Sequence, residues 1–288
     1  MEEKKYHKNS IEKDEEKFVD FNLLDQAQGF DGKSAIKTIT DYMGFSLSEF
    51  SHGYTTKVAA NFSEFSEKRY YPTLGYSKRL GRGRGVKVKS FLEILNILAI
   101  RDKASDIMVG NMFAPVFVEN YGPDRNSDFL IKLIIPQLSD YTKSVAQENG
   151  LETKVEKSKK WDISKHDWVP NNIVLAKFPN ELEYRLIVPE EILTTKLPYD
   201  ANDFIYRYWL TLLNERRKEN GLKPYTQKDL REKEVSKYDS NHDYILSVLR
   251  QMSDEYLLGY MPRFKQSSIN NSKKKNKHKR NKSKKHKK

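Results

Sequence analysis

The C-terminal segment, residues 265–288, constrains the fold most, because it holds eleven lysines, one arginine and no acidic residue. A segment of this composition has too little apolar surface to offset its chain entropy, so it is predicted to be a disordered tail. The rest of the chain then carries 40 basic and 40 acidic residues and is neutral. Clustered basic residues bind phosphate backbones in a salt-dependent way. The tail is therefore predicted to bind DNA or RNA weakly, chiefly through residues such as Lys273, Lys274, Lys275 and Arg280. The alternatives are a purely solubilising role and attraction to a membrane surface, the latter less favoured because no amphipathic helix or lipidation signal accompanies the tail.

Length and composition limit the remaining possibilities. With 288 residues, 37% of them hydrophobic, the chain can build one or two domains. It has no cysteine, which excludes disulfides, thiolate zinc sites and cysteine nucleophiles. Its first residues lack the apolar core of a signal peptide, and no stretch reaches the roughly 18 apolar residues of a membrane span. We therefore expect a cytoplasmic protein without a membrane span.

The spacing of apolar residues predicts an α+β fold, with mixed helices and a small sheet or hairpin. Helical periods cover residues 31–43, 90–100, 127–147, 202–221 and 240–260, and β-branched runs cover 113–118, 173–178 and 182–188. The expected N-terminal caps include Asp31, either Asp200 or Asn202, and Ser240, and Gly44 is expected to end the first helix. The charged segment 151–160 is expected to be a connection. The last two runs predict a hairpin. The expected organisation is a mobile charged arm (1–17), an α+β region (18–150), a hairpin plus helical region (151–264) that either joins the first or stands alone, and the tail.

A basic, glycine-rich loop precedes the helix that Ser90 is expected to cap. Three glycines alternate there with basic residues, namely Arg79, Arg82, Arg84, Lys87 and Lys89. Glycines let backbone N–H groups approach an anion, and a helix N-terminus adds positive charge. The spacing matches neither a Walker A motif nor a dinucleotide fingerprint. The loop is therefore predicted to contact phosphate or nucleic acid, with a solvated surface loop as the alternative.

An acidic pair, Asp124 and Asp128, lies in the segment Gly122–Asp128 between a predicted strand and a predicted helix. Two carboxylates can share Mg²⁺, which prefers oxygen ligands. A metal-dependent nuclease centre would need a further carboxylate and a cation, for which Glu152 and Lys154 are candidates. A long helix, however, intervenes where such centres have a strand hairpin. The alternative is that Asp124 or Ser127 caps the helix and Asp128 complements its dipole.

The segment from Val116 to Thr142, with Gly-Pro-Asp-Arg-x-Ser-Asp and then Tyr141-Thr142, resembles bacterial proteins of mobile elements and anti-phage defence islands, as does Arg185–Pro189. The resemblance implies a nucleic-acid-directed role in antiviral defence without indicating a catalytic residue. The leading hypothesis is a nucleic-acid-associated protein, with Mg²⁺-dependent nuclease activity left open. The alternative is a non-catalytic adaptor or structural subunit that the basic tail anchors to DNA or RNA and that binds protein partners.

Overall fold

The computed structural model describes residues 6–7, 15–65, 68, 70–75, 87–99, 116, 118, 121–179, 181–195 and 200–253. They form the α+β fold predicted from the sequence, with helices dominating two small antiparallel sheets. No helix within these ranges has both the length and the apolar character that crossing a membrane requires. Part of the predicted phosphate-binding set lies outside the described residues, namely Arg79, Arg82, Arg84, Lys273, Lys274, Lys275 and Arg280.

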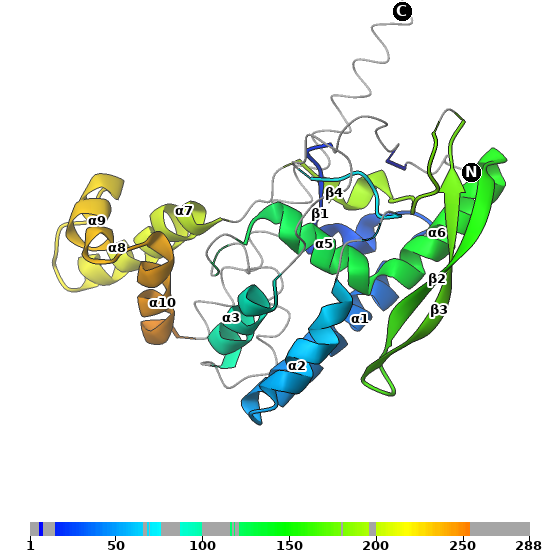
Figure 1. Cartoon of the computed structure of the whole chain (residues 1–288). Coiled ribbons are helices and arrows are strands. Elements are labelled where there is room, and N and C mark those ends of the chain that lie inside the picture. The colour runs from blue at the N-terminus through cyan, green and yellow to red at the C-terminus, as the bar shows by residue number, and fades with distance from the viewer. Residues whose placement is uncertain are drawn as a thin grey trace, which may run out of the picture.

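Helix α1 (Gly32–Ser51) begins as predicted, because the Asp31 carboxylate accepts the Ser34 N–H at 3.1 Å. The prediction that it ends at Gly44 is wrong. Glycine inside a helix costs about 1 kcal/mol, but the added turns bring Phe45 and Phe50 against the hydrophobic core, which outweighs this cost. Helix α2 (Thr55–Phe62), the short helix η2 (Ser63–Phe65) and helix α3 (Val88–Ala99) complete this side of the body (Figure 1).

Two helices replace the single helix predicted from Ser127. Helix α5 (Pro123–Leu133) and helix α6 (Ile135–Asn149) meet at Ile134. Pro136 lies in the first turn of α6, where a residue without an N–H group is tolerated, and it prevents the two helices from forming one regular helix. Gly150 ends α6 with a φ of 61°, a left-handed conformation that glycine adopts without strain.

The main hairpin consists of β2 (Glu152–Asp162) and β3 (Asp167–Lys177), paired antiparallel from Glu152↔Lys177 to Asp162↔Asp167. The predicted antiparallel pairing of 173–178 with 182–188 is present at one isolated bridge, where Ala176 and Arg185 exchange two backbone hydrogen bonds at 2.9–3.0 Å, and it does not extend into a named strand pair. The charged segment expected to be a connection is instead the first strand. Strand β3 packs on α6, where its Val174 N–H donates to the Ser139 hydroxyl at 2.8 Å.

A smaller sheet joins distant parts of the chain. Strand β1 (Phe18–Val19), followed by η1 (Phe21–Gln26), pairs antiparallel with β4 (Leu193–Thr194), which follows η3 (Glu190–Ile192). Within the segment expected to be a mobile arm, Tyr6 bridges to Pro189, and His7 donates its N–H to the Val188 carbonyl at 2.9 Å. The His7 side chain is 1% exposed. These two residues are therefore packed against the body.

The hydrophobic core is centred on Tyr42 of α1, which is completely buried. The centroid of its ring lies 4.9–6.1 Å from the centroids of five other aromatic rings, those of Phe65, Phe91, Phe129, Trp161 and Trp168. These rings come from η2, α3, α5 and both strands of the β2–β3 hairpin. The core therefore attaches the hairpin directly to the helices.

The C-terminal helices lie to one side of this body (Figure 1). A continuous helical segment contains α7 (Ala201–Asp203), the π-helical stretch η4 (Phe204–Trp209) and α8 (Leu210–Glu219). It is followed by α9 (Gln227–Lys233), η5 (Val235–Lys237) and α10 (Asn241–Gln251). The carboxylate of Asp200 and the hydroxyl of Ser240 accept hydrogen bonds from the first turns of α7 and α10, in agreement with the predicted caps.

Candidate functional site

The acidic pair predicted to bind metal lies on consecutive turns of α5. Helix α5 begins at Pro123 after Gly122, with no side chain capping it, so neither Asp124 nor Ser127 is the cap. Asp124 lies directly against Gly75, which has a φ of 116°, and a β-carbon at Gly75 would collide with the Asp124 carboxylate. Burial raises the pKa of Asp124. Burial raises the pKa of Tyr121, and the nearby carboxylate of Asp128 raises it further.

Other polar residues of α5 and α6 form hydrogen bonds that hold these helices to neighbouring segments. The Ser127 hydroxyl accepts the N–H of Val19 at 3.0 Å and so fixes α5 to β1. Further along, the Thr142 hydroxyl accepts the N–H of Ile187 at 2.8 Å and donates to the Leu138 carbonyl at 2.7 Å. Asn126 is 1% exposed, and among the described residues neither of its amide atoms has a hydrogen-bond partner. Most of the polar motif is thus engaged in packing.

The remaining candidates for a nuclease centre do not join the acidic pair. Glu152 binds Lys177 at 2.8 Å and the Tyr184 hydroxyl, and Lys154 binds Glu156 at 2.9 Å. Asp124 lies in the first turn of α5, whereas Glu152 begins β2 after the end of α6, and α5 and α6 follow one another across the body (Figure 1). Among the described residues, no group of three or more His, Asp or Glu side chains could hold a metal ion. The Mg²⁺ nuclease hypothesis stays a prediction.

The described part of the basic loop consists of Lys87 and Lys89, whose side chains are exposed at the start of α3. Helix α3 begins at Val88, two residues before the predicted cap. Ser90 is therefore inside the first turn and is 8% exposed, which corrects the prediction that it caps the helix. Within the described part of the chain, neither lysine forms an ion pair, and both lie at the positively polarised end of α3.

A basic surface that sequence reasoning missed lies on the turn-proximal half of the β2–β3 hairpin. We define the hairpin lysines as Lys157, Lys160 and Lys165. None of them forms an ion pair with a described residue, and the β3 residues opposite Lys157 and Lys160 are the uncharged Asn172 and Val169. Because side chains alternate along a strand, Lys157 and Lys160 lie on opposite faces of β2, so the hairpin lysines are distributed around the ribbon near its turn.

The acidic residues nearest the hairpin turn are held by local backbone groups. Asp162 accepts hydrogen bonds from the N–H groups of Ser164 and Lys165 and from the Ser164 hydroxyl, at 2.6–3.2 Å. These bonds lower the pKa of Asp162. Asp167 accepts the N–H of Trp168 at 2.7 Å. Both carboxylates stay close to the hairpin lysines, and the charge of Lys165 also helps to lower the pKa of Asp162 after the Ser164 hydrogen bonds, so this end carries the three hairpin lysines against two carboxylates.

A buried lysine, Lys132 of α5, lies beside this surface and was also missed. Its side chain is 2% exposed, and its Nζ lies 4.6 Å from the ring centroid of Trp168. Burial is the main cause that lowers its pKa to about 8, and the nearby Lys68 and Lys159 lower it further while Glu64 opposes them. A lysine inside the apolar run 129–135 was the available signal, but the sequence does not show that Trp168 covers it.

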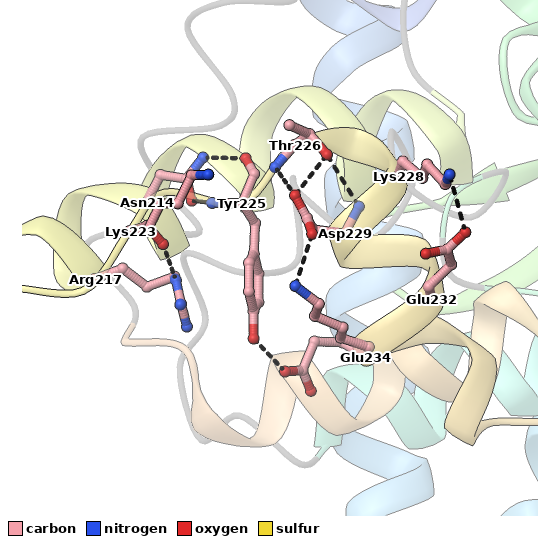
Figure 2. A network of polar contacts seen from close by, with 10 residues as sticks. Asn214, Arg217, Lys223, Tyr225, Thr226, Lys228, Asp229, Glu232 and Glu234 are labelled. Carbon is pink, nitrogen blue, oxygen red and sulfur yellow. Dashed lines mark hydrogen bonds and ion pairs between the residues drawn. The ribbon is translucent and has the colours of Figure 1, made fainter.

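The C-terminal helices hold a polar network around Tyr225 (Figure 2). Asn214 accepts the Tyr225 N–H at 2.7 Å and donates to its carbonyl at 2.9 Å, which fixes the loop between α8 and α9. The Arg217 guanidinium lies 3.7 Å from the Tyr225 ring centroid, and Thr226 and Asp229 cap α9 reciprocally. Because these groups satisfy one another, the network is a structural device rather than a ligand site.

Comparisons with known proteins leave the activity open. No curated protein and no solved structure matches the chain. One family model matches residues 1–200, which include the α5 segment, the hairpin and Lys132 but end before α7. The match covers more than half of the chain, and the chain therefore belongs to the family described as Domain of unknown function (DUF8370).

Proposed function

We propose that this protein binds nucleic acid by contacting phosphate groups with the hairpin lysines Lys157, Lys160 and Lys165. The observation that carries the proposal is their lack of ion pairs with any described residue, on a hairpin whose nearby carboxylates are held by the turn. The basic tail of the sequence adds twelve positive charges to the same protein. Binding of this kind is sequence-independent and weakens as salt rises.

The shape of the hairpin is compatible with this role. Two antiparallel strands form a ribbon of the width that the major groove of B-form DNA accepts, whereas the major groove of A-form RNA is too narrow. The proposal therefore favours duplex DNA over duplex RNA. A role in defence against invading DNA is part of the proposal, and its support is the resemblance of the α5 segment to bacterial defence-island proteins.

The test is a gel-shift titration with a labelled DNA duplex over a range of salt concentrations. The variant Lys157→Gln/Lys160→Gln/Lys165→Gln should bind about tenfold more weakly near 0.1 M salt, with a log–log salt slope shallower by about 2–3. The matched control is Lys33→Gln/Lys37→Gln/Lys143→Gln, which removes equal charge from exposed positions of α1 and α6. An equal loss of DNA affinity in both variants would show that the effect depends only on net charge, and it would refute the hairpin site.

Deleting residues 265–288 separates the contributions of the tail and the body. We expect weakened binding that still depends on the hairpin lysines. Complete loss with the tail would favour the alternative, an adaptor whose body binds a protein partner. The same gels run with Mg²⁺ and with EDTA report cleavage, and metal-dependent cleavage that Asp124→Ala/Asp128→Ala abolishes would support the nuclease hypothesis.

A further inference from the structure

The turn of the β2–β3 hairpin carries an imidazole ring, that of His166, which two residues of α1 hold in place. The ring stacks on Phe45, with the centroids 4.9 Å apart and the planes inclined by 14°. Its Nε2 atom lies 3.5 Å from one carboxylate oxygen of Asp41. The other oxygen of Asp41 accepts the indole N–H of Trp161 at 2.6 Å. The orientation of the imidazole is therefore fixed both by a ring beneath it and by a carboxylate at its edge.

The backbone of His166 is strained. Its φ is 48°, and among the described residues no other residue except glycine has a positive φ. This left-handed conformation is unfavourable for most side chains, although His, Asn and Asp adopt it more often than the others. Glycine or asparagine would close the turn with no more strain, and neither would place an aromatic ring there. What His166 adds to this turn is therefore the ring itself.

Much of this ring is accessible from solvent. The side chain of His166 is 47% exposed, although Phe45 covers one of its faces. Trp161 lies beside the stacked pair, with its ring centroid 5.4 Å from that of Phe45 and 6.4 Å from that of His166. The exposed part of the imidazole therefore includes the face turned away from Phe45. An exposed flat ring on a rigid support is the arrangement on which nucleic-acid bases stack.

We propose that the exposed face of His166 stacks with an unpaired base of DNA. This stacking site rests on the proposed function, in which the hairpin lysines hold the phosphates of the same DNA. Lys165 directly precedes His166, and both side chains are exposed in the described structure. A strand whose phosphate contacts Lys165 would therefore bring its bases close to the imidazole.

The stacking site gives the protein a preference that phosphate contacts alone do not give. Contacts with phosphates position a protein on DNA but do not distinguish one base or structure from another. In an intact duplex the faces of the bases are covered by their neighbours, and only the base edges are accessible in the grooves. A ring can therefore stack only where a base is unpaired, as in a bulge, a flap or a single-stranded end. Because every base has an aromatic face, the preference is for structure and not for sequence.

The experiment compares the affinity of the full chain for two duplexes by fluorescence anisotropy. One duplex carries a single bulged adenine, and the other carries an abasic residue at the same position, so both have the same phosphates. The wild type should bind the adenine bulge about five- to tenfold more tightly. His166→Asn, which keeps a residue that tolerates the left-handed turn, should bind both duplexes equally. His166→Tyr, which keeps an aromatic ring, should retain the preference.

The matched control is His52→Asn, which removes an exposed imidazole at the end of α1 and should leave the preference unchanged. Thermal unfolding of each variant shows that it is folded under the conditions of the binding assay. A second readout uses 2-aminopurine as the bulged base, since stacking quenches its fluorescence. Saturating wild-type protein should quench this signal, whereas saturating His166→Asn should leave it close to that of the free duplex. A purely structural role of His166 would not change this signal.

Failure of the stacking site and failure of the proposed function give different results. The variant that lacks the hairpin lysines should bind both duplexes more weakly by the same factor and keep the preference for the bulged adenine. Equal binding of the two duplexes by the wild type, or an unchanged preference in His166→Asn, would refute the stacking site and leave the lysine contacts in place. A wild type that binds neither duplex would refute both.

Discussion

The α5–α6 segment and the β2–β3 hairpin use their polar side chains in opposite ways. In the helices, the hydroxyls of Ser127, Ser139 and Thr142 each accept a backbone N–H from another element. In the hairpin, Lys157 and Lys160 form no ion pair with described residues. The α5–α6 segment, which has the more distinctive sequence motif, thus uses its polar groups within the fold. The β2–β3 hairpin, which has only a charged sequence, keeps lysines that a ligand could contact. Distinctive polarity in a sequence therefore does not by itself indicate a binding site.

The attachment of the hairpin to the body can be broken at Trp168. This residue is 8% exposed, packs on the rings of Tyr42 and Phe65, and donates its indole N–H to the Asn61 carbonyl at 3.0 Å. Trp168→Ala should lower the free energy of unfolding by about 3–5 kcal/mol, measured by denaturant titration. Val155→Ala on the same hairpin, at a side chain that is 64% exposed, should change it by less than about 0.5 kcal/mol. A small effect at Trp168 would mean that the hairpin is not anchored there.

The structural role of the helix hydroxyls can be tested at Thr142. Thr142→Val keeps the shape of the side chain but leaves the buried N–H of Ile187 without its acceptor. We expect a loss of about 2 kcal/mol in unfolding free energy, with unchanged DNA affinity per folded molecule. The control is Thr56→Val at an exposed position of α2. Reduced DNA affinity at full folding would instead assign a ligand role to this segment.

The smallest expected effect concerns pH and His7. Burial lowers the pKa of His7 below its usual 6.5, and the nearby Lys17 acts in the same direction, while Glu15, Glu190 and the Thr73 backbone oppose them. The unfolded chain therefore takes up this proton at a higher pH than the folded protein. The stability contributed by neutral His7 is present above pH 6.5 and declines as pH falls towards the folded pKa.

Thermal unfolding between pH 5 and 7.5 measures this contribution. His7→Gln should flatten the decline of Tm below pH 6.5 relative to the wild type, whereas His52→Gln, at an exposed side chain, should leave it unchanged. An identical slope in all three proteins would show that the environment of His7 does not favour its neutral form.

Local sequence signals predicted the helices well but the strands poorly. Asp31 and Ser240 act as predicted because a cap depends on a side chain and the backbone a few residues later. Strand β2 was missed because only its Trp161 end is buried, so the segment lacks the alternation of apolar and polar residues that indicates a strand. The turn between β2 and β3 has four residues and contains neither Gly nor Asn. The usual sequence signal of a hairpin turn is therefore missing between these two strands.

The candidate site was less predictable than the fold. The acidic pair was noticed because its residues are close in sequence, yet Glu152 and Lys154 pair with other partners. The environment of Lys132 depends on Trp168, which lies far along the chain. A lysine that is buried by a residue far along the chain leaves no local sequence pattern. Its aliphatic side-chain carbons fit on any amphipathic helix, whether or not the ammonium group is exposed.

The free edge of β2 bears on how several protein molecules would bind along one polyanion. Among the described strands, β2 pairs only with β3, so it is an edge strand of this two-stranded sheet. Lysines along such an edge repel a second copy and prevent strand addition between molecules. A polyanion that neutralises Lys157 and Lys160 also removes this repulsion. Neighbouring molecules that share the same polymer would then associate edge to edge more readily, so occupancy would increase cooperatively along it.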